Sequence, residues 1–467
     1  MATLFKALAR QPVLRGIGVP LIPFVVVEGA LITLSANVSW FCLILAIAAW
    51  FIMRRMTNED ESIFHLIWLK YQTRGVFKMN RHYDATVISA AQYDAVDMSD
   101  IINSMKLNER MPLEKIIPYS SHIDTQIVKT RNTDEIATWE ILGVPFECEK
   151  DDDLKIINNQ LNTMLRSWEG KPVTFYTHRI REEFYEHLDS PSGNDLADEI
   201  SRKYYDGIRD TKLYRNRIFY TVCYMPFTKE QKAQNAMRKP AEKKKAIEET
   251  LPEMREIISK LSASLKRFHA RPLGMYEDET GVYSSQLSFY QYLLSGIWQK
   301  VRLTKTPFYE VLGGVDLFLS QDTGQVNTAR SKRFFRSIEI KDFCEQTEAG
   351  LMDALLYQPV TYVLTTSFSA MGKRETITSI DDKLKHLNSA GDEAESQLVD
   401  LKVAKDLVTS GVISFGRFHY SLMIYADTMD ELVRDSNAIV TVLEDLGFIV
   451  SLSMLSLGAA FLAQLPG

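Results

Sequence analysis

Two Gly-Lys pairs are the only places where this 467-residue sequence could begin a phosphate-binding loop. Such a loop needs the string GxxxxGK[ST], because its glycines let backbone amides surround the phosphates while the lysine meets the terminal phosphate. At Gly170-Lys171, Leu165 occupies the first glycine position and Pro172 follows the lysine. This pair therefore does not predict a nucleotide site.

The second pair, Gly372-Lys373, departs from the pattern in the same way, with Ser367 at the first glycine position and Arg374 after the lysine. The sequence also lacks GxGxxG, HExxH and GxSxG strings, which mark dinucleotide sites, zinc proteases and hydrolase nucleophiles. We therefore expect no catalytic, cofactor-binding or metal-binding residue in this chain. By itself, it should be inert toward ATP.

Three weaker candidates each have a competing structural interpretation. His419 begins a strand-like segment, which favours a buried or edge histidine over a catalytic one. Asp151–Asp153 could bind a metal, but acids at the start of a helix also complement its dipole, and we prefer that interpretation. The basic run 238–245, RKPAEKKK, could contact nucleic acid or anionic lipid, but its interleaved glutamates are more typical of a solvated helix face. We do not expect direct nucleic-acid binding.

Composition and cysteine usage fit an ordinary intracellular globular body. Hydrophobic residues make up 46% and charged residues 24% of the chain, and the net charge of −6 gives no global reason to bind nucleic acid. The length predicts two or three domains. Reduced thiols are expected, because the cysteines form no CxxC pair and have no histidine at metal-ligand spacing. They are Cys42, Cys148, Cys223 and Cys344.

Two apolar runs near the N-terminus, residues 17–34 and 39–53, predict a transmembrane helical hairpin. Each run is at the short end of what spans a hydrocarbon core of about 30 Å. Basic residues outside both runs place the two ends on the cytoplasmic side and the turn near Ala36 and Asn37 outside. Trp40 and Trp50 lie near the ends of the second run, as interfacial aromatics do. The flanking basic residues are Lys6, Arg10, Arg15, Arg54 and Arg55.

Three other interpretations of these runs remain open. A signal peptide would have a similar first half, but no cleavage site precedes the second run. A buried soluble hairpin is compatible with the short runs and with Pro20 and Pro23, which interrupt the first. A shallow hairpin confined to one leaflet would accommodate those prolines and Glu28, the one charge within the first run.

After the hairpin, the patterns predict an α+β, or mixed α/β, body built from ferredoxin-like βαβ units. Asn58 should cap a short amphipathic helix, with Glu61 in the capping-box position. Residues 76–108 look like a linker. Hydrophobic periodicity then predicts a hairpin around residues 131–135, strands and helices in alternation, and two long helices. The elements are strands near 127–128, 136–142, 172–178, 217–225, 359–368, 418–426 and 448–455, and helices near 151–168, 229–268, 376–409 and 430–447.

Several strings resemble the CagE/TrbE family of conjugative type IV secretion ATPases, which includes the fourth VirB subunit. They run from IIPYSSHID at 116–124 and NRIFYTVCYMP at 216–226 to TTSFSAMGK at 365–373, FGRFHYSLMIYADT at 415–428 and AAFLAQLPG at 459–467. The resemblance covers residues 109–467. Residues 1 to about 100, with LARQPVLRGIGVPLIPFVVVEG and IFHLIWLK, are similar to the small third VirB membrane protein. A natural fusion and an artificial one both remain possible.

The resemblance implies a division of labour along the chain. It assigns residues 1–75 to the membrane hairpin and juxtamembrane helix, 76–108 to a linker, 109–455 to the ATPase N-terminal domain and 456–467 to the start of a connection. The family's RecA-like motor, which binds ATP and Mg²⁺, would follow and is absent from this chain. This portion would then anchor and assemble a secretion ATPase that energises conjugative DNA or protein transfer and pilus biogenesis.

The same resemblance implies location and partners. The protein would be at the bacterial inner membrane, in contact with lipid through residues 17–53 and with its body on the cytoplasmic side. It would form a homo-oligomer based on a hexamer and meet other inner-membrane secretion subunits, pilin and companion ATPases. The alternative is an unrelated, non-enzymatic membrane-tethered module that binds nucleic acid or anionic lipid.

Overall fold

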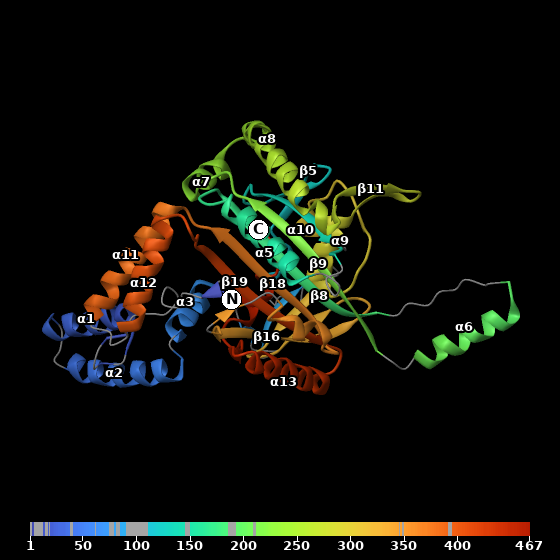
Figure 1. The fold of residues 1–467 in the computed structure, drawn as a ribbon. Coiled ribbons are helices and arrows are strands. Elements are labelled where there is room, and N and C mark those ends of the chain that lie inside the picture. Colours follow the sequence, from blue (N-terminus) through green and yellow to red (C-terminus); the bar gives the residue numbers. More distant parts are fainter. Residues whose placement is uncertain are drawn as a thin grey trace, which may run out of the picture.

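The computed structural model describes residues 2–3, 13–14, 17, 19–37, 41–60, 62–73, 79–80, 85–89, 111–144, 150–184, 193–208, 212–344, 346–347, 350–390 and 395–467. Figure 1 shows a long twisted sheet with helices against it, and helical parts that stand away from it at both ends. The fold is mixed α/β, as the sequence predicts.

One half of the sheet is a ferredoxin-like unit formed by residues 135–272. Its strands lie in the order β10-β7-β9-β8, and every neighbouring pair is antiparallel. Since β7 and β8 lie on either side of β9, α5 carries the chain across it, and α8 returns the chain to β10. The elements are β7 (Glu135–Ile141), α5 (Asp151–Arg166), β8 (Val173–Phe184), α6 (Asp195–Ile208), β9 (Leu213–Tyr224), α7 (Lys229–Met237), α8 (Pro240–Leu265) and β10 (Ala270–Pro272).

The other half repeats this topology with residues 332–452. Its strands lie in the order β20-β16-β19-β18, again antiparallel throughout. A short 3₁₀ helix, η4, occupies the place that α5 has in the first unit. The elements are β16 (Lys332–Asp342), η4 (Asp353–Tyr357), β18 (Thr361–Ala370), α11 (Lys373–Ala390), α12 (Glu395–Thr409), β19 (Gly416–Ala426), α13 (Met429–Asp445) and β20 (Ile449–Leu452).

The two units meet through equivalent strands. β8 pairs antiparallel with β18 from Tyr362↔Arg181 to Phe368↔Phe175, so the halves form one continuous sheet. Each unit also carries a helical insertion at the same place in its topology, α6 between β8 and β9, and α11 with α12 between β18 and β19. We call the β8–β18 junction the seam.

The two faces of the sheet bury different helices. Alternation along the strands places Phe175, Trp139 and Tyr362 on one face, which α5, α8 and α13 cover. The opposite face carries the largest cluster of buried side chains, which includes residues of α9 (Ser285–Ser295) and α14 (Leu457–Leu462). The middle of the molecule is therefore a helix–sheet–helix sandwich.

Shorter strands extend the sheet at both edges. β6 pairs with β7 through Val128↔Ile136, which confirms the hairpin predicted around residues 131–135. Two small sheets lie apart from the main one: β1 with β17, and β11-β12-β13. The additional elements are β1 (Ala2–Thr3), β2 (Met79–Asn80), β4 (Met111–Pro112), η2 (Leu113–Lys115), β5 (Tyr119–Asp124), β6 (Ile127–Thr130), η3 (Lys266–Phe268), β11 (Met275–Asp278), β12 (Gly281–Ser284), β13 (Val301–Arg302), α10 (Phe308–Val311), β14 (Asp316–Leu319), β15 (Gly324–Asn327) and β17 (Gln346–Thr347).

The predicted linker at 76–108 contains a strand of the main sheet, so the linker prediction is wrong there. β3 (Ala85–Ser89) pairs with β14 through Ile88↔Leu317 and Val87↔Phe318, and both β3 side chains are buried. The strand is short, and its partner lies more than two hundred residues further along the chain, beyond the reach of any local pattern. Residues 90–110 lie outside the described part.

Three helix predictions also need correction. The helix predicted over 229–268 is two helices, because α8 begins with Pro240 at its first position, where a missing N–H costs nothing. The helix predicted over 376–409 is α11 followed by α12, which pack together through Ile380, Leu387 and Leu401. Asn58 caps no helix, since it lies inside α2 (Phe41–Glu59).

Candidate functional site

The N-terminal helices form the predicted hairpin. α1 (Leu21–Asn37) packs against α2, and α3 (Ile63–Thr73) follows it. The indole N–H of Trp50 donates to the carbonyl of Ile17 at 3.1 Å, which ties the start of the first run to the second helix. None of the helices in the described ranges is both long and apolar enough to cross a bilayer, so the predicted crossing is unconfirmed.

Large apolar side chains of this hairpin point into solvent on several sides. Glu28, by contrast, is only 6% exposed. Its burial reverses the usual distribution, in which apolar groups lie inside and charges outside. The side chains exposed by more than 45% are Ile22, Val25, Val26, Ile32, Leu34, Leu43, Ile44, Ile47, Phe51 and Ile52.

An ion pair connects these helices to the sheet. The Lys341 ammonium, on β16, lies 2.6 Å from Asp60 Oδ2, and both side chains are about one-fifth exposed. Asp60 Oδ1 also accepts hydrogen bonds from the backbone N–H and the hydroxyl of Ser62, at 2.8 and 2.7 Å, just before α3 begins. Partial burial raises the pKa of Asp60, but these hydrogen bonds and the lysine charge lower it more. This carboxylate therefore helps to fix the joint between α2 and α3 against the body.

The C-terminal segment 457–467 lies across the seam, on the face opposite α13. His178 on β8 donates through Nε2 to the carbonyl of Gln464 at 2.7 Å, and Ser421 on β19 donates to the carbonyl of Ala460 at 3.3 Å. Burial lowers the pKa of His178 to about 4, against the opposing hydrogen bond to Gln464, so its ring is neutral. Residues of both units thus hold the same segment.

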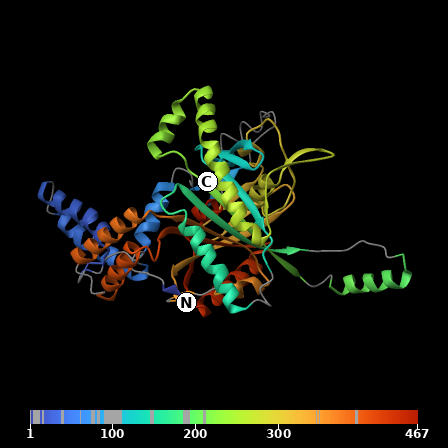
Figure 2. The same cartoon turned by 45° about the horizontal axis from the view of Figure 1, so that its top comes forward.

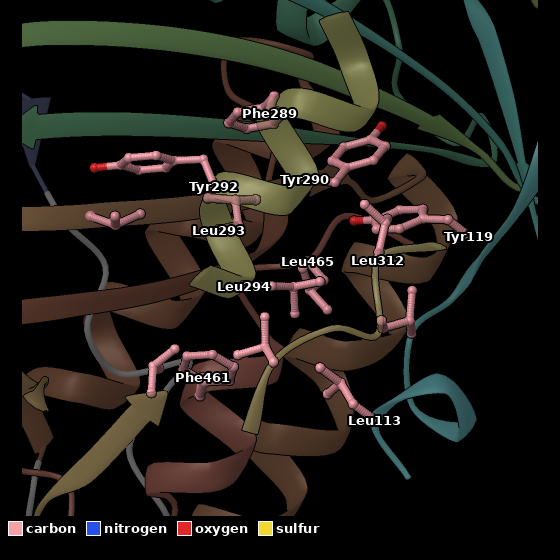
Figure 3. Close-up of a cluster of buried hydrophobic side chains, with 14 of the residues drawn as sticks. Leu113, Tyr119, Phe289, Tyr290, Tyr292, Leu293, Leu294, Leu312, Phe461 and Leu465 are labelled. Carbon is pink, nitrogen blue, oxygen red and sulfur yellow. The ribbon is translucent and has the colours of Figure 1, made fainter. Parts of the chain in front are cut away.

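Apolar side chains complete this attachment. Figure 3 shows Phe461 and Leu465 among side chains of α9 and of the segments that carry Leu113 and Leu312. The Phe461 ring stacks on Phe335 of β16, with centroids 5.0 Å apart. The segment AAFLAQLPG, which the sequence analysis assigned to a connection, is therefore part of the core where the two units meet.

His419 lies on β19, where the sequence predicted a buried or edge strand histidine. Burial lowers its pKa. The strand register aligns His419 with Ser367, and Ser367 with Tyr176, beside a cavity of about 570 Å³ that Lys115 also lines. A serine and a histidine could act in hydrolysis only with a group that orients the imidazole. The described residues that line this cavity include no Asp or Glu side chain for that purpose.

The fold brings the two Gly-Lys pairs together. The Gly170 N–H donates to the carbonyl of Ala370 at 3.4 Å, and Gly170, with a φ of +70°, packs against Gly372. Lys171 lies over the Trp168 ring, and the Lys373 ammonium donates to the carbonyl of Thr409 at 2.6 Å. Both lysines are engaged within the protein, and neither faces a loop of backbone amides. These residues do not fit a nucleotide.

The other sequence candidates take structural places. Asp151–Asp153 form the first turn of α5, as predicted, and Asp152 pairs with Lys155 at 3.3 Å. Within the described ranges, no group of three His, Cys, Asp or Glu residues could hold a metal. In the basic run, Lys244 is 80% exposed and lies 3.8 Å from Glu248, as expected of a solvated face. Cys42 and Cys223 are free thiols, whereas Cys148 lies outside the described part.

A buried acidic pair was missed by the sequence analysis, which took RNTDE for a polar turn. Asp134 pairs with Lys232 of α7 at 2.6 Å, and Thr250 of α8 donates to Glu135 at 2.5 Å. Burial raises the pKa of Glu135 to about 7, against the hydrogen bond from Thr250 and with help from the nearby Glu253 and Asp134 carboxylates. An Asp-Glu pair beside a strand looks exposed until α7 and α8 are placed over it.

Because burial raises the pKa of Glu135, we expect the free energy of unfolding to fall as the pH rises toward neutrality. Its folded pKa lies above its unfolded value, so the stabilisation is complete below about pH 4.5 and is lost as the pH rises through about 7. Between pH 5 and pH 8, the free energy of unfolding of the parent chain should fall by on the order of 2 kcal/mol more than that of Glu135→Gln, because glutamine does not titrate. Urea unfolding at both pH values measures it, with the exposed Glu248→Gln as the control. Equal pH dependence in the two variants would contradict the assignment.

Three family models match successive parts of the chain. Residues 1–84 match "Type IV secretory pathway, VirB3-like protein", and residues 126–232 match "Type IV secretion system ATPase VirB4/TrbE, N-terminal domain". Residues 271–467 match "CagE, TrbE, VirB family, component of type IV transporter system". The order of these matches is the order that the sequence resemblance implied.

Curated relatives align with most of the chain. It is 32% identical over 373 residues to a type IV secretion system protein virB4 of Brucella suis, an alignment that covers 78% of this chain and 45% of that protein. The type IV secretion system protein PtlC of Bordetella pertussis is 30% identical over 366 residues, an alignment that covers 77% of this chain and 44% of PtlC. The virB4 protein of Bartonella quintana is 27% identical over 369 residues, with 78% and 47% covered. The chain thus spans about half the length of the curated relatives it matches.

Proposed function

This chain belongs to the CagE/TrbE/VirB family of type IV secretion proteins and carries a VirB3-like region ahead of its VirB4-like region, and we propose that it anchors and assembles a secretion ATPase at the bacterial inner membrane. The observation that carries the proposal is the apolar hairpin, whose large side chains are exposed. The Asp60–Lys341 ion pair joins the residues after this hairpin to the sheet. A hairpin of this kind needs an apolar surrounding.

The distribution of the exposed side chains favours lipid over a single protein partner. Ile22, Val25 and Val26 project from α1, and Ile47 and Ile52 project from α2, each exposed by more than half. A protein groove covers one face of a helix pair, whereas a bilayer covers every side. Contiguous apolar surfaces beyond a few hundred Å² mark interaction sites in soluble surroundings. We therefore place the hairpin in the membrane.

We propose that the hairpin inserts without crossing both leaflets. α1 has 17 residues, which at 1.5 Å per residue gives about 26 Å, short of a hydrocarbon core of about 30 Å. Glu28 is shielded within the hairpin and so limits the cost of a carboxyl group at that depth. Both features favour a shallow hairpin confined to one leaflet over a full crossing.

Two attachments would hold the α/β body in a defined position relative to the membrane-inserted hairpin. The Asp60–Lys341 ion pair holds the α2–α3 joint, and β3 adds a strand to the main sheet just after the residues that match the VirB3-like model. The ATP chemistry would come from residues outside 1–467, which would bind ATP and Mg²⁺. The described portion would set where that motor lies, and we propose that it self-associates and meets pilin and other secretion subunits in conjugative transfer.

The membrane proposal predicts a large loss of vesicle binding when the hairpin surface is made polar. The full chain should float with vesicles of phosphatidylethanolamine and phosphatidylglycerol, and the bound fraction should resist 1 M salt because apolar burial is not screened. Changing Val25, Val26, Ile47 and Ile52 to serine should reduce it by roughly tenfold or more, at about 1.5–3 kcal/mol per buried apolar side chain.

A matched control uses four other exposed apolar residues away from the hairpin. Leu142, Ile156, Val282 and Val433 are each exposed by more than a third, and their replacement by serine should leave flotation unchanged. Equal flotation of the hairpin variant and the parent chain would overturn the proposal. Binding that disappears at high salt would instead favour the alternative, a basic surface at 238–245 that binds anionic lipid or nucleic acid. Deleting residues 1–108 is a poorer test, because it also removes β3.

A further inference from the structure

α6 stands clear of the rest of the described chain at the end of a long two-stranded stalk. β8 and β9 pair from Val173↔Tyr224 out to Phe184↔Leu213, and α6 lies beyond that end in both views of the fold (Figures 1 and 2). Asn194 precedes the helix, and its side chain accepts a hydrogen bond from the Leu196 N–H at 3.0 Å. A helix of 14 residues is only marginally stable in water unless one of its faces is packed. Among the described residues, none covers the face of α6 that carries Leu196, Ile200 and Tyr204.

One face of α6 is apolar and uncovered. Leu196, Ile200 and Tyr204 are 68%, 60% and 64% exposed, and their spacing of four places them about 40° apart around the helix. Gly207 falls within the same stripe and leaves room on it, since a Cβ there would meet nothing within 4 Å. The stripe is thus continuous over most of the helix and accessible to a second helix.

The charged side chains beside the stripe, Glu199 and Lys203, indicate which kind of helix would pair with it. Glu199 and Lys203 both flank the stripe on the same side and pair with each other at 2.9 Å, while remaining exposed. In an antiparallel helix pair, a flank of one helix meets the same flank of the other, whereas in a parallel pair it meets the opposite flank. The opposite flank of α6 carries Ala197 and Ser201, which offer no charge.

We propose that α6 pairs in antiparallel fashion with α6 of a second copy of this chain. With the two-fold axis near Ile200, Leu196 lies against Tyr204 of the partner copy, and Glu199 lies against its Lys203. The apolar contact and the ion pair each form twice, once on each side of the axis, which is the self-complementarity that an isologous contact requires. The apolar stripe and the charged flank thus specify the same partner and the same orientation.

The contact is small and acts among chains that are already close together. α6 is about 21 Å long, so one helix pair buries far less than the roughly 1,200–2,000 Å² of a stable interface. Chains held on one membrane surface have a high effective concentration for each other. In this respect the inference rests on the proposed assembly role, but the orientation and charge pattern can be tested without it.

Cysteine cross-linking of the full chain tests the contact itself. Ile200→Cys should cross-link to its own copy with a short bismaleimide, because residue 200 lies near the axis. Arg202→Cys, exposed on the opposite side of the helix, is the matched control and should cross-link roughly tenfold less. The parent chain measures the background from its own four cysteines. Equal yields from the two variants would show that this face of α6 is not a self-contact.

Orientation is tested by mixing variants. Chains with Leu196→Cys mixed with chains with Tyr204→Cys should form the mixed cross-link in preference to the Leu196→Cys self-cross-link. A parallel pair gives the reverse order. That result would overturn the antiparallel arrangement, even if self-association itself persisted.

Charge reversal supplies the sharpest test. Glu199→Lys and Lys203→Glu each place like charges at both inter-helix contacts, so each variant alone should lose about tenfold in Ile200→Cys cross-linking. A mixture of the two variants restores both opposite-charge contacts and should recover the yield, although each helix still carries its own like-charge pair. A mixture no better than the separate variants would refute the pairing. Vesicle flotation of the same variants should be unchanged, so a failed membrane role and a failed α6 contact give different results.

Discussion

Replacing Gly324 with alanine is expected to destabilise the second half of the sheet severely. A Cβ at position 324 would lie 2.0 Å from Cζ of Phe335, the residue opposite it across the β15–β16 pair. The Phe335 ring is fully buried, with Tyr425 and Phe461 rings 5.9 and 5.0 Å from it, so it has no free space into which to move. The glycine is required because the aromatic ring covers its backbone.

The expected loss is about 3 kcal/mol or more, at the upper end for overpacking in a core. Thermal unfolding of the full chain measures it, with Gly314→Ala as the matched control, because a Cβ there meets nothing within 4 Å. Adding Phe335→Leu to Gly324→Ala should cost less than the two changes would separately, since the smaller side chain relieves the clash. A Gly324→Ala protein as stable as Gly314→Ala would mean that β15 and β16 do not pair in this register.

Phe461→Ala should release the C-terminal segment from the seam. Phe461 is 2% exposed, and truncation of a buried phenylalanine costs about 3–5 kcal/mol through lost burial and the remaining cavity. The smaller Leu457 and Leu465 side chains and the hydrogen bonds from His178 and Ser421 then remain to hold the segment, and each hydrogen bond contributes only about 1 kcal/mol net. We therefore expect local opening of residues 457–467 before the sheet itself unfolds.

Labelling of Cys223 under native conditions measures that opening. Cys223 pairs with Ile136 across β7 and β9, and Gly467 lies against Ile136, so the segment shields this thiol. Phe461→Ala should label roughly a hundredfold faster than the parent chain, from the expected change in opening equilibrium. Phe418→Ala, which removes a ring that is 53% exposed, is the control and should label at the parent rate. Unchanged labelling in Phe461→Ala would show that the segment is not held by this ring.

The C-terminal segment 457–467 contacts both halves of the sheet and so couples them. His178 belongs to β8 of the first unit, Ser421 to β19 of the second, and both bind carbonyls of residues 460–464. A displacement of that segment would act on both units together. The places of His178 and Ser421 beside this segment depend on the pairing of β8, β18 and β19, which no local sequence motif specifies.

Residues near each other in the sequence were predicted best. The hairpin of β6 and β7, helix α5 and helix α13 follow from alternation or from a period of 3.6 residues, which a short window contains in full. The N-terminal helix pair follows from two apolar runs and a short break. Its membrane crossing stays a prediction, because length and hydropathy near the limit do not decide it.

Other features were decided by partners far along the chain. β3 looked like a linker because five residues in a polar neighbourhood carry little signal until β14 pairs with them. The stalk and α6 were missed, since nothing local distinguishes a helix that packs on its own sheet from one that projects beyond it. Glu135 appeared to lie in an exposed turn until α8 covered it.

The sequence by itself therefore determined the family, through strings that resemble those of its members. It also determined the apolar hairpin, the mixed α/β class and most of the helices and strands, because these depend on local periodicity and composition. Only the tertiary structure decided the pairing of the two ferredoxin-like units, the burial of the C-terminal segment at their seam and the exposure of the α6 stripe. Those features depend on which strands become neighbours, and strand pairing joins residues separated by up to hundreds of positions through backbone groups that every residue shares.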